Sequence, residues 1–394
     1  MSFIKSNNDI SIYVHWPFCL SLCPYCDFNS HILQDINIEE WTNAYLKEID
    51  HFSYLLRKKN VKTIFFGGGT PSLMPPQIPE KIIEYISNIA NITKKTEITL
   101  EANPTSSERK TFKSFKNVGI NRLSIGVQSF NDEDLSFLGR MHSSKEASEV
   151  INAASEIFDN FSFDLIYARP GQTVEKWQKE LEYALSFASP HISLYQLTIE
   201  KGTHFYKLHK EKKLNMPSSE ISGDLFDMTN NLLQEQGYNR YEISNYAKKG
   251  FESRHNLTYW RYDDYLGIGP GAYSRFNNSE IVTYHNPNKW IDSLNNKGTA
   301  IQRQTKLPLN VRINEMVMMC MRIKEGLDEE QLMQKTGKDF WQILNLKYLE
   351  QLKINNYILQ TQSYYNPVKN AISYTEAGLN LHSYLTSRLI KEEF

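Results

Sequence analysis

Three of the four cysteines lie close together near the start of the chain, with spacing that suits a metal site. Cys19, Cys23 and Cys26 are separated by three and then two residues. A loop with this spacing can wrap its thiolates around a compact iron–sulfur cluster. Zinc sites usually combine two cysteine or histidine pairs. No second pair follows in the sequence, so zinc or chance clustering is the weaker alternative. Cys320 lies in an apolar run and is expected in the core.

A four-iron cluster with three protein ligands leaves one iron open to another molecule. Four cysteines are the usual protein ligand set, so the missing fourth ligand is a chemical opening. The amine and carboxylate of an amino acid can chelate that iron. The Cys-x3-Cys-x2-Cys spacing resembles the motif of radical-SAM proteins, which bind S-adenosylmethionine (SAM) in this way. We therefore expect a [4Fe–4S] cluster on Cys19, Cys23 and Cys26, with exchangeable SAM.

A glycine-rich turn, Gly67-Gly68-Gly69-Thr70-Pro71, follows the expected strand 61–66. Residues without side chains expose backbone groups and let a ligand approach closely. The turn falls one strand–helix unit after the cysteine loop. In radical-SAM proteins this position contacts the methionine amino group, so the same contact is expected here.

Polar residues occupy the ends of the next three expected strands. Glu101, Gln128 and Asp164 stand at these ends, and Arg140 follows Gln128 by twelve residues. Carboxylates and amides can bind ribose hydroxyls, and arginine pairs with carboxylates. The ordinary alternative for each residue is a solvated loop end or a helix cap.

The elements that must position these residues alternate along the first part of the chain. Apolar runs at strand spacing alternate with amphipathic helical segments. Expected strands are 12–16, 61–66, 97–101, 122–127, 161–167 and 191–199. Expected helices are 38–59, 79–90, 108–117, 145–158, 174–187 and 221–236. This rhythm predicts an α/β fold with a parallel sheet curled into a partial (β/α)6 barrel, with the site at the strand C-terminal ends.

Two further regions follow the predicted radical-SAM core, which covers residues 1–237. Residues 238–305 are rich in tyrosine, asparagine and glycine, and are expected to form an irregular extension. Residues 306–394 are expected to form a smaller, mainly helical and winged-helix-like domain. Its expected helices are 310–323, 328–335, 338–352 and 376–390, with strands at 357–361 and 371–374.

The composition is that of a soluble protein with no electrostatic bias. The 394 residues include 44 Lys and Arg against 45 Asp and Glu, which argues against a nucleic-acid partner. No apolar run approaches the roughly 20 residues needed to span a bilayer, and the polar N-terminus lacks a signal peptide's apolar core. We expect a cytoplasmic protein without a transmembrane segment.

Taken together, these segments resemble the anaerobic coproporphyrinogen III oxidase family of radical-SAM proteins over nearly the whole chain. The resemblance implies that cluster-bound SAM is contacted by Tyr13, Gly68, Glu101 and the backbone of Tyr25. It further implies that positions able to hold a second SAM are Gly69, Thr70, Gln128, Arg140 and Asp164.

Within that family, several features resemble the haem-chaperone subfamily more than the dehydrogenase. Phe28 stands where the dehydrogenase has a fourth cysteine, and only twelve residues precede Tyr13. The segment Arg254-His255-Asn256-Leu257-Thr258-Tyr259-Trp260 resembles the subfamily's His-Asn-x-x-Tyr-Trp motif. A histidine can ligate haem iron and aromatic rings can stack on a porphyrin, so His255 is expected to bind haem. The alternative is a buried histidine within ordinary aromatic packing.

At two positions the sequence differs from the pattern of these relatives. Ala168-Arg169 stands where relatives often have Gly-Leu, and Tyr273 where many have a histidine. We expect a haem chaperone whose partners are haem, a haem-acceptor protein and a reductant for the cluster. The alternative is an oxygen-independent coproporphyrinogen III dehydrogenase of porphyrin metabolism, which decarboxylates its substrate oxidatively. A structural domain with a vestigial cluster is the third possibility.

Overall fold

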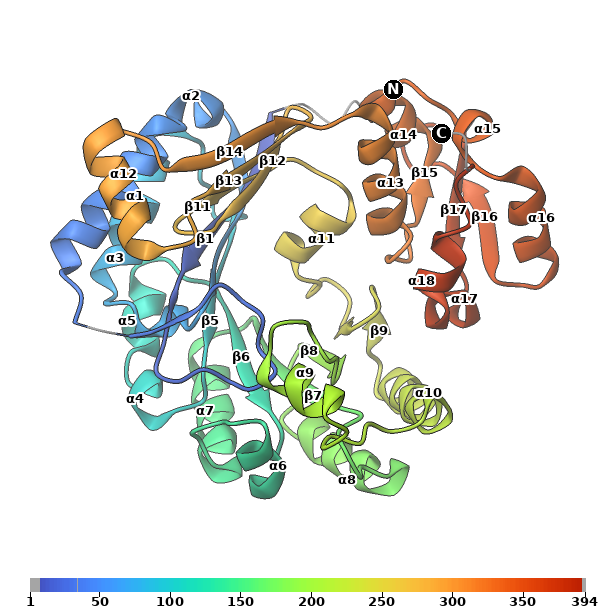
Figure 1. Ribbon diagram of the computed structural model, residues 1–394, viewed down its shortest axis with the longest axis horizontal. Coiled ribbons are helices and arrows are strands. Elements are labelled where there is room, and N and C mark those ends of the chain that lie inside the picture. The colour runs from blue at the N-terminus through green and yellow to red at the C-terminus, as the bar shows by residue number, and fades with distance from the viewer. Residues whose placement is uncertain (1–7, 34, 392–394) are drawn as a thin grey trace.

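A computed structural model describes residues 8–33 and 35–391, so most of the polar N-terminal segment lies outside the described residues. A twelve-stranded sheet dominates, with strand order β14-β13-β12-β11-β1-β4-β5-β6-β7-β8-β10-β9 (Figure 1). The six predicted strands are parallel neighbours in chain order. They are β1 (Asp9–Trp16), β4 (Asn60–Gly68), β5 (Glu97–Ala102), β6 (Arg122–Gln128), β7 (Phe161–Tyr167) and β8 (His191–Gln196).

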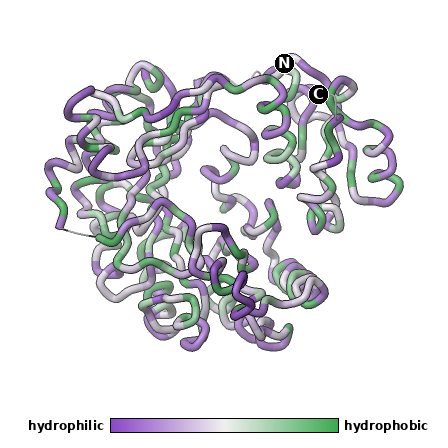
Figure 2. The backbone as a smooth tube through the Cα atoms, viewed as in Figure 1, coloured by the Kyte–Doolittle hydropathy of each residue, from purple (hydrophilic) through white to green (hydrophobic). Residues whose placement is uncertain are grey.

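Helices cover the outer, convex side of this curled sheet, as the predicted partial barrel requires (Figure 1). They include α1 (Ile38–His51), α3 (Gln77–Ile89), α5 (Phe112–Asn117), α7 (Ser144–Ile157), α8 (Val174–Leu185) and α10 (Ser219–Glu235). The tube coloured by hydropathy shows hydrophobic residues along the strands (Figure 2). Trp41, Tyr45 and Ile49 recur every four residues, so they share one face of α1 and are all buried.

Two predicted helices are broken. Helix 38–59 ends at His51, and α2 (Ser53–Leu56) follows it after Phe52 leaves helical geometry with φ −92° and ψ 6°. Helix 108–117 consists of α4 (Ser106–Arg109) and α5. The short helices η1 (Pro71–Leu73), α6 (Asp132–Phe137) and α9 (His204–Lys210) were not predicted, because each is too short to show a clear apolar period.

The prediction of irregular structure over 238–305 was wrong. Its elements are β9 (Asn239–Arg240), β10 (Asn245–Ala247), α11 (Arg254–Trp260), β11 (Tyr265–Ile268), β12 (Tyr273–Phe276), β13 (Ser279–Thr283), α12 (Pro287–Lys297) and β14 (Ile301–Lys306). β11 pairs in parallel with β1 and begins an antiparallel ribbon, while β10 pairs with β8. The segment therefore extends both edges of the main sheet and shares its hydrophobic core, which runs from Ile10 to Ala300.

The C-terminal region is mainly helical, as predicted, and has its own hydrophobic core. Its helices are α13 (Leu309–Cys320), α14 (Glu329–Thr336), α15 (Phe340–Ile343), α16 (Leu346–Ile354), α17 (Glu376–Asn380) and α18 (His382–Thr386). A small sheet completes it, in the order β15 (Leu327–Asp328), β17 (Asn370–Tyr374), β16 (Ile358–Gln362). Cys320 is 1% exposed in this core, which confirms its expected place.

Within the described ranges, no helix is both long enough and apolar enough to cross a membrane.

Candidate cluster and SAM site

The cysteine loop leaves the C-terminal end of β1 and is held by backbone hydrogen bonds. Cys19 lies in β2 (Phe18–Cys19), which pairs in parallel with β3 (His31–Ile32). The His31 N–H donates to the Pro17 carbonyl at 2.7 Å. The N–H of Cys26 donates to the Cys23 carbonyl at 3.2 Å, which closes a turn between two thiols. All three thiols are free and partly exposed. The hydrogen-bonded loop therefore leaves them accessible to a ligand.

The glycine turn is hydrogen-bonded to the start of this loop. The N–H groups of Gly69 and Thr70 donate to the carbonyls of Trp16 and Phe18 at 2.7 and 2.8 Å. A Cβ at Gly69 would lie 2.6 Å from the Phe18 oxygen, so only glycine permits this approach. Gly68, at φ +114°, turns its N–H toward Glu101 Oε2 at 3.1 Å. The turn therefore joins the cysteine loop to the end of β5.

Glu101, near the C-terminal end of β5, and Asp164, in the middle of β7, form a pair of partly buried carboxyl groups. Burial raises the pKa of Glu101 to about 8, and the charge of Asp164 adds to this shift. Burial likewise raises the pKa of Asp164 to about 6. Asp164 Oδ1 is buried and has no hydrogen-bond partner among the described residues. Two carboxyl groups with raised pKa values suit a cationic ligand, such as the sulfonium group of SAM.

Arg140 links the C-terminal ends of β5 and β6 to the cysteine loop. Its Nη1 lies 3.4 Å from Cys23 Sγ, and its Nη2 donates to Asn103 Oδ1 at 2.5 Å and to the Gly126 carbonyl at 2.8 Å. Asn103 in turn donates to Thr70 Oγ1 at 2.9 Å. An open hollow beside this chain of contacts is lined by Ser21, Cys23, Asn103, Thr105, Gly139, Arg140, Met141 and His142.

Asn103 is a site residue that the sequence argument missed. Asn103 directly follows β5, two residues after Glu101. Its polar side chain at this strand end is the sequence feature that could have predicted it. Its side chain connects Thr70 to Arg140 and thus the glycine turn to the Cys23 contact. Gly139 was missed too: at φ +66° it lies so close to Pro24 that a Cβ would be 2.6 Å from the proline ring.

Tyr13, Tyr25 and Gln128 lie around this centre. The Tyr13 ring stacks on Phe65, and its hydroxyl lies 3.0 Å from His15 Nδ1. Burial lowers the pKa of His15 to about 4, so its ring is neutral near pH 7; its Nε2 lies 2.9 Å from the Asn29 carbonyl. Nε2–H therefore donates to that carbonyl, and Nδ1 accepts from Tyr13. Burial raises the pKa of Tyr25, and Gln128 adopts φ +70°, a strained conformation at the end of β6.

The donor set fits a cluster of iron ions. Burial is the main cause that raises the pKa of Cys19, and the charge of Cys23 adds to it. Burial also raises the pKa of Cys26 to about 11, with further contributions from Cys23 and Cys19. The three sulfurs therefore lie near enough to repel one another as thiolates. Bound cations remove such repulsion and deprotonate coordinating thiols.

His255 lies on α11 at the concave side of the sheet (Figure 1), with its ring centroid 6.3 Å from that of Tyr13. It is 1% exposed, and its ring stacks on Phe65 with a centroid distance of 4.9 Å. Nδ1 lies 2.6 Å from Thr63 Oγ1 and Nε2 lies 2.8 Å from the Tyr259 hydroxyl. Both ring nitrogens are therefore hydrogen-bonded, so haem ligation by His255 would require one of these contacts to break, and it stays a prediction.

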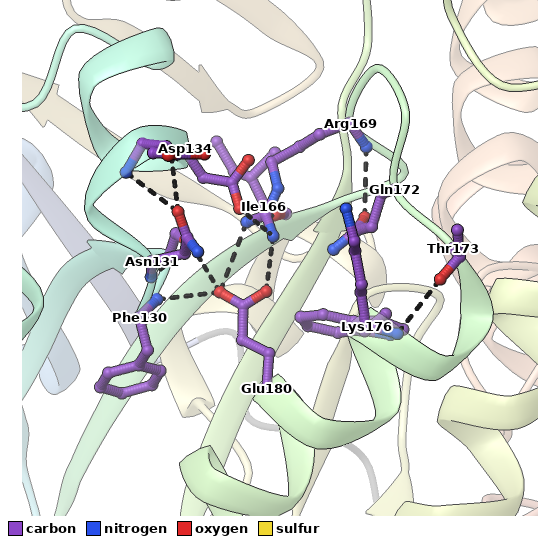
Figure 3. A network of polar contacts seen from close by, with 12 residues as sticks. Phe130, Asn131, Asp134, Ile166, Arg169, Gln172, Thr173, Lys176 and Glu180 are labelled. Atoms are coloured by element: carbon purple, nitrogen blue, oxygen red, sulfur yellow. Dashed lines mark hydrogen bonds and ion pairs between the residues drawn. The ribbon is translucent and has the colours of Figure 1, made fainter.

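A network of ion pairs and hydrogen bonds lies at the C-terminal ends of β6 and β7, with Arg169 at its centre (Figure 3). Arg169 is 2% exposed and contacts Glu180 at 2.5 Å and Asp134 at 3.1 Å. Glu180 also accepts hydrogen bonds from the Ser129 hydroxyl and the Phe130 N–H. The network joins the loops after β6 and β7. Ala168 beside it adopts φ +56°, a conformation that glycine tolerates better.

Comparison with known proteins defines the class. Residues 13–184 match the Radical SAM superfamily, and residues 307–363 match the HemN C-terminal domain. The solved structure of coproporphyrinogen III oxidase (HemN) from Escherichia coli superposes with a TM-score of 0.79 at 22% identity. It covers 96% of this chain and 89% of that one, which shows a shared fold. The molecule is a radical-SAM protein with a HemN-type C-terminal domain.

Curated relatives narrow the assignment. The mitochondrial radical S-adenosyl methionine domain-containing protein 1 of Danio rerio is 36% identical over 332 residues, covering 82% of this chain and 74% of the relative. The heme chaperone HemW of Bacillus subtilis is 33% identical over 330 residues, covering 83% and 87%. HemW of Haemophilus influenzae is 36% identical over 339 residues, covering 83% and 86%. The chain belongs to the coproporphyrinogen III oxidase family of radical-SAM proteins that includes these HemW relatives. Membership implies a [4Fe–4S] cluster and SAM.

Proposed function

We propose that the chain is a haem chaperone that binds haem and passes it to an acceptor protein. The observation that carries this proposal is the similarity to relatives named heme chaperone HemW, which extends over 83% of the chain. Phe28 adds to it: this side chain is 63% exposed beside the cluster loop and offers no sulfur. Haem, an acceptor protein and a reductant for the cluster are the proposed partners.

In this proposal, Cys19, Cys23 and Cys26 hold the cluster. When bound, the cluster supplies an electron and an open iron position. Glu101 and Asp164 bind the sulfonium group of SAM, since both are partly buried carboxyl groups whose pKa values are raised by burial. The Gly68 N–H fixes the Glu101 carboxylate through a hydrogen bond of 3.1 Å. Tyr13, Tyr25 and Gln128 complete the proposed SAM pocket.

We assign a structural role to Arg140, Gly69 and Thr70, in place of binding a second SAM. Arg140 and Thr70 already share hydrogen bonds through Asn103, and Gly69 is covered by the Phe18 backbone. The Arg140 guanidinium also lies beside Cys23 Sγ, where a fixed positive charge stabilises a thiolate. These groups therefore hold the cysteine loop in the shape that receives the cluster.

The decisive experiment separates chaperone from enzyme. Cluster-loaded full-length protein is incubated anaerobically with reductant, SAM and coproporphyrinogen III, and in parallel with haem. We expect haem to be retained and coproporphyrinogen III to stay unconverted. Sustained formation of protoporphyrinogen IX would overturn the proposal in favour of the dehydrogenase.

Replacing Glu101 with glutamine is expected to weaken SAM binding about 10- to 100-fold while leaving the cluster intact. Loss of a hydrogen-bonded charge contact costs about 1.5–3 kcal/mol, and Glu101 contacts no cysteine in the hydrogen bonds of the site. The measurement is a SAM titration followed by the EPR signal of the reduced cluster. Glu97→Gln is the matched control, since Glu97 is a buried carboxyl at the opposite end of β5, bound to the N–H groups of Arg254 and His255.

If Glu97→Gln weakens SAM binding as much as Glu101→Gln, the placement of SAM at the C-terminal end of β5 is wrong.

SAM affinity is also expected to rise with pH between 6 and 8. In the free protein the pKa values of Glu101 and Asp164 are raised to about 8 and about 6, so these groups are partly protonated over that range. A bound cation favours the ionised carboxylates, so binding releases protons and strengthens as pH rises, by at most about tenfold per pH unit for each proton released. The increase in SAM affinity ends above the Glu101 pKa.

The amine of SAM titrates as well, so the test compares wild type with Glu101→Gln. The SAM affinity of the variant should rise less steeply with pH between pH 7 and 8. Equal slopes would contradict the assignment.

A further inference from the structure

A haem chaperone needs a group that can bind haem iron, and five of the ten histidines of this chain are buried. Both ring nitrogens of His255 are hydrogen-bonded within the core. Four more histidines are buried: His15, His142, His191 and His382. An iron ligand on the surface near the cluster loop has to be sought elsewhere.

Tyr273 and His285 are two such groups. Tyr273 begins β12 and is 45% exposed, while His285 follows the end of β13 and is also exposed. Since β12 and β13 are paired, both residues lie at the same end of this ribbon, with ring centroids 6.4 Å apart. Within the described part of the chain, neither the Tyr273 hydroxyl nor the His285 ring donates or accepts a hydrogen bond that would block it.

This pair is fixed to the cluster loop through Asn29. The Asn29 amide donates to the carbonyls of Pro270 and His285, each at 3.0 Å. Gly271, at φ +77°, permits the contact, because a Cβ there would lie 2.4 Å from the Asn29 amide nitrogen. The Asn29 carbonyl is itself held by His15. The position of Tyr273 and His285 is therefore coupled to the segment that follows Cys26.

The same loop carries exposed apolar side chains. Phe28, next to Asn29, is 63% exposed, and Ile32 is 58% exposed in β3, paired opposite Cys19. An apolar surface beside an exposed phenol and imidazole has the chemistry that a metalloporphyrin requires: contact for the flat macrocycle and a donor for its iron.

Resting on the haem-chaperone function proposed above, we propose that Tyr273 and His285 form the iron-binding part of a haem site beside the cluster loop. The Tyr273 phenolate oxygen ligates ferric haem iron, as tyrosine does in catalase. Ligation releases the phenol proton, and His285 beside it accepts that proton. Phe28 and Ile32 contact the macrocycle. The ligand class is an iron porphyrin in its ferric state.

The test is a titration of cluster-loaded full-length protein with ferric haem, followed by the Soret and visible bands. Tyr273→Phe removes only the hydroxyl and is expected to weaken binding at least about tenfold, the loss of one iron bond, and to change the ferric spectrum. His285→Gln removes the proposed proton acceptor and is expected to weaken binding. Tyr273→His should bind haem with an imidazole-type spectrum. Controls are Tyr54→Phe, 65% exposed on α2, and His209→Gln, exposed on α9.

The outcomes separate the two claims. Wild-type protein that binds no haem removes the chaperone function itself. Wild-type protein that binds haem while Tyr273→Phe keeps the same affinity and spectrum overturns the site but leaves the function. A folded His255→Ala variant that loses haem, with Tyr273→Phe unaffected, overturns the site in favour of α11.

Discussion

Replacing any one of Cys19, Cys23 or Cys26 with alanine is expected to reduce bound iron from about four per chain to near zero. Each cysteine supplies one of only three protein ligands, so removing one leaves two irons without a protein bond. Nothing nearby can substitute: the position two residues after Cys26 is Phe28, and Cys320 is buried in the C-terminal core. The measurement is iron and sulfide analysis with EPR after anaerobic reconstitution.

Cys320→Ala is the matched control and should retain the full cluster. Circular dichroism and thermal unfolding of the metal-free variants should be close to those of metal-free wild type, because backbone hydrogen bonds hold most of the loop and only Cys23 Sγ is contacted by Arg140. A full cluster in any of the three loop variants, or its loss in Cys320→Ala, would contradict the ligand assignment.

The second large effect concerns Arg169. Arg169→Leu is expected to lower the free energy of unfolding by about 3–5 kcal/mol, because it leaves a buried carboxylate without its cation. Figure 3 shows Glu180 between Arg169 and the Phe130 N–H, so the lost contact cannot be replaced by a simple turn toward solvent. Denaturant unfolding followed by tryptophan fluorescence checks this, since Trp177 lies on α8 with Glu180.

Arg109→Leu provides the comparison, because it breaks an ion pair with Glu149 in which both side chains are more than 40% exposed. Such exposed pairs contribute less than about 1 kcal/mol. The double variant Arg169→Leu with Glu180→Leu should recover part of the loss, since only Asp134, whose side chain is 34% exposed, is then left without its cation. Stability of Arg169→Leu within 1 kcal/mol of wild type would show that the network is not a structural support.

The parts of the fold that sequence predicts well are those with long, regular patterns. The parallel strands β1 and β4 to β8 are apolar runs bounded by turns, and all six were found. The ribbon β11 to β14 was missed because its strands are short and polar: β14 is exposed along most of its length. Its pairing with β1 brings together residues more than 250 positions apart, which no local pattern reports.

The candidate site shows the same division. Spacing alone predicted Cys19, Cys23 and Cys26 as ligands, and expected strand ends predicted Glu101 and Asp164, although Asp164 lies in the middle of β7. His255 was different, because a motif shows which residues are present but not which hydrogen bonds they make. Its two partners, Thr63 and Tyr259, come from β4 and from the same helix. The exposure of Tyr273 and its closeness to His285 also depend on the pairing of β12 with β13, which only the structure supplies.

The chaperone function is tested most directly by the haem content of the full-length, cluster-loaded protein after incubation with excess ferric haem and gel filtration. We expect about one haem per chain, saturable and retained on the monodisperse protein peak, with coproporphyrinogen III left unchanged by the same preparation. Protein that emerges without haem in both its cluster-loaded and its cluster-free form would contradict the proposed chaperone function.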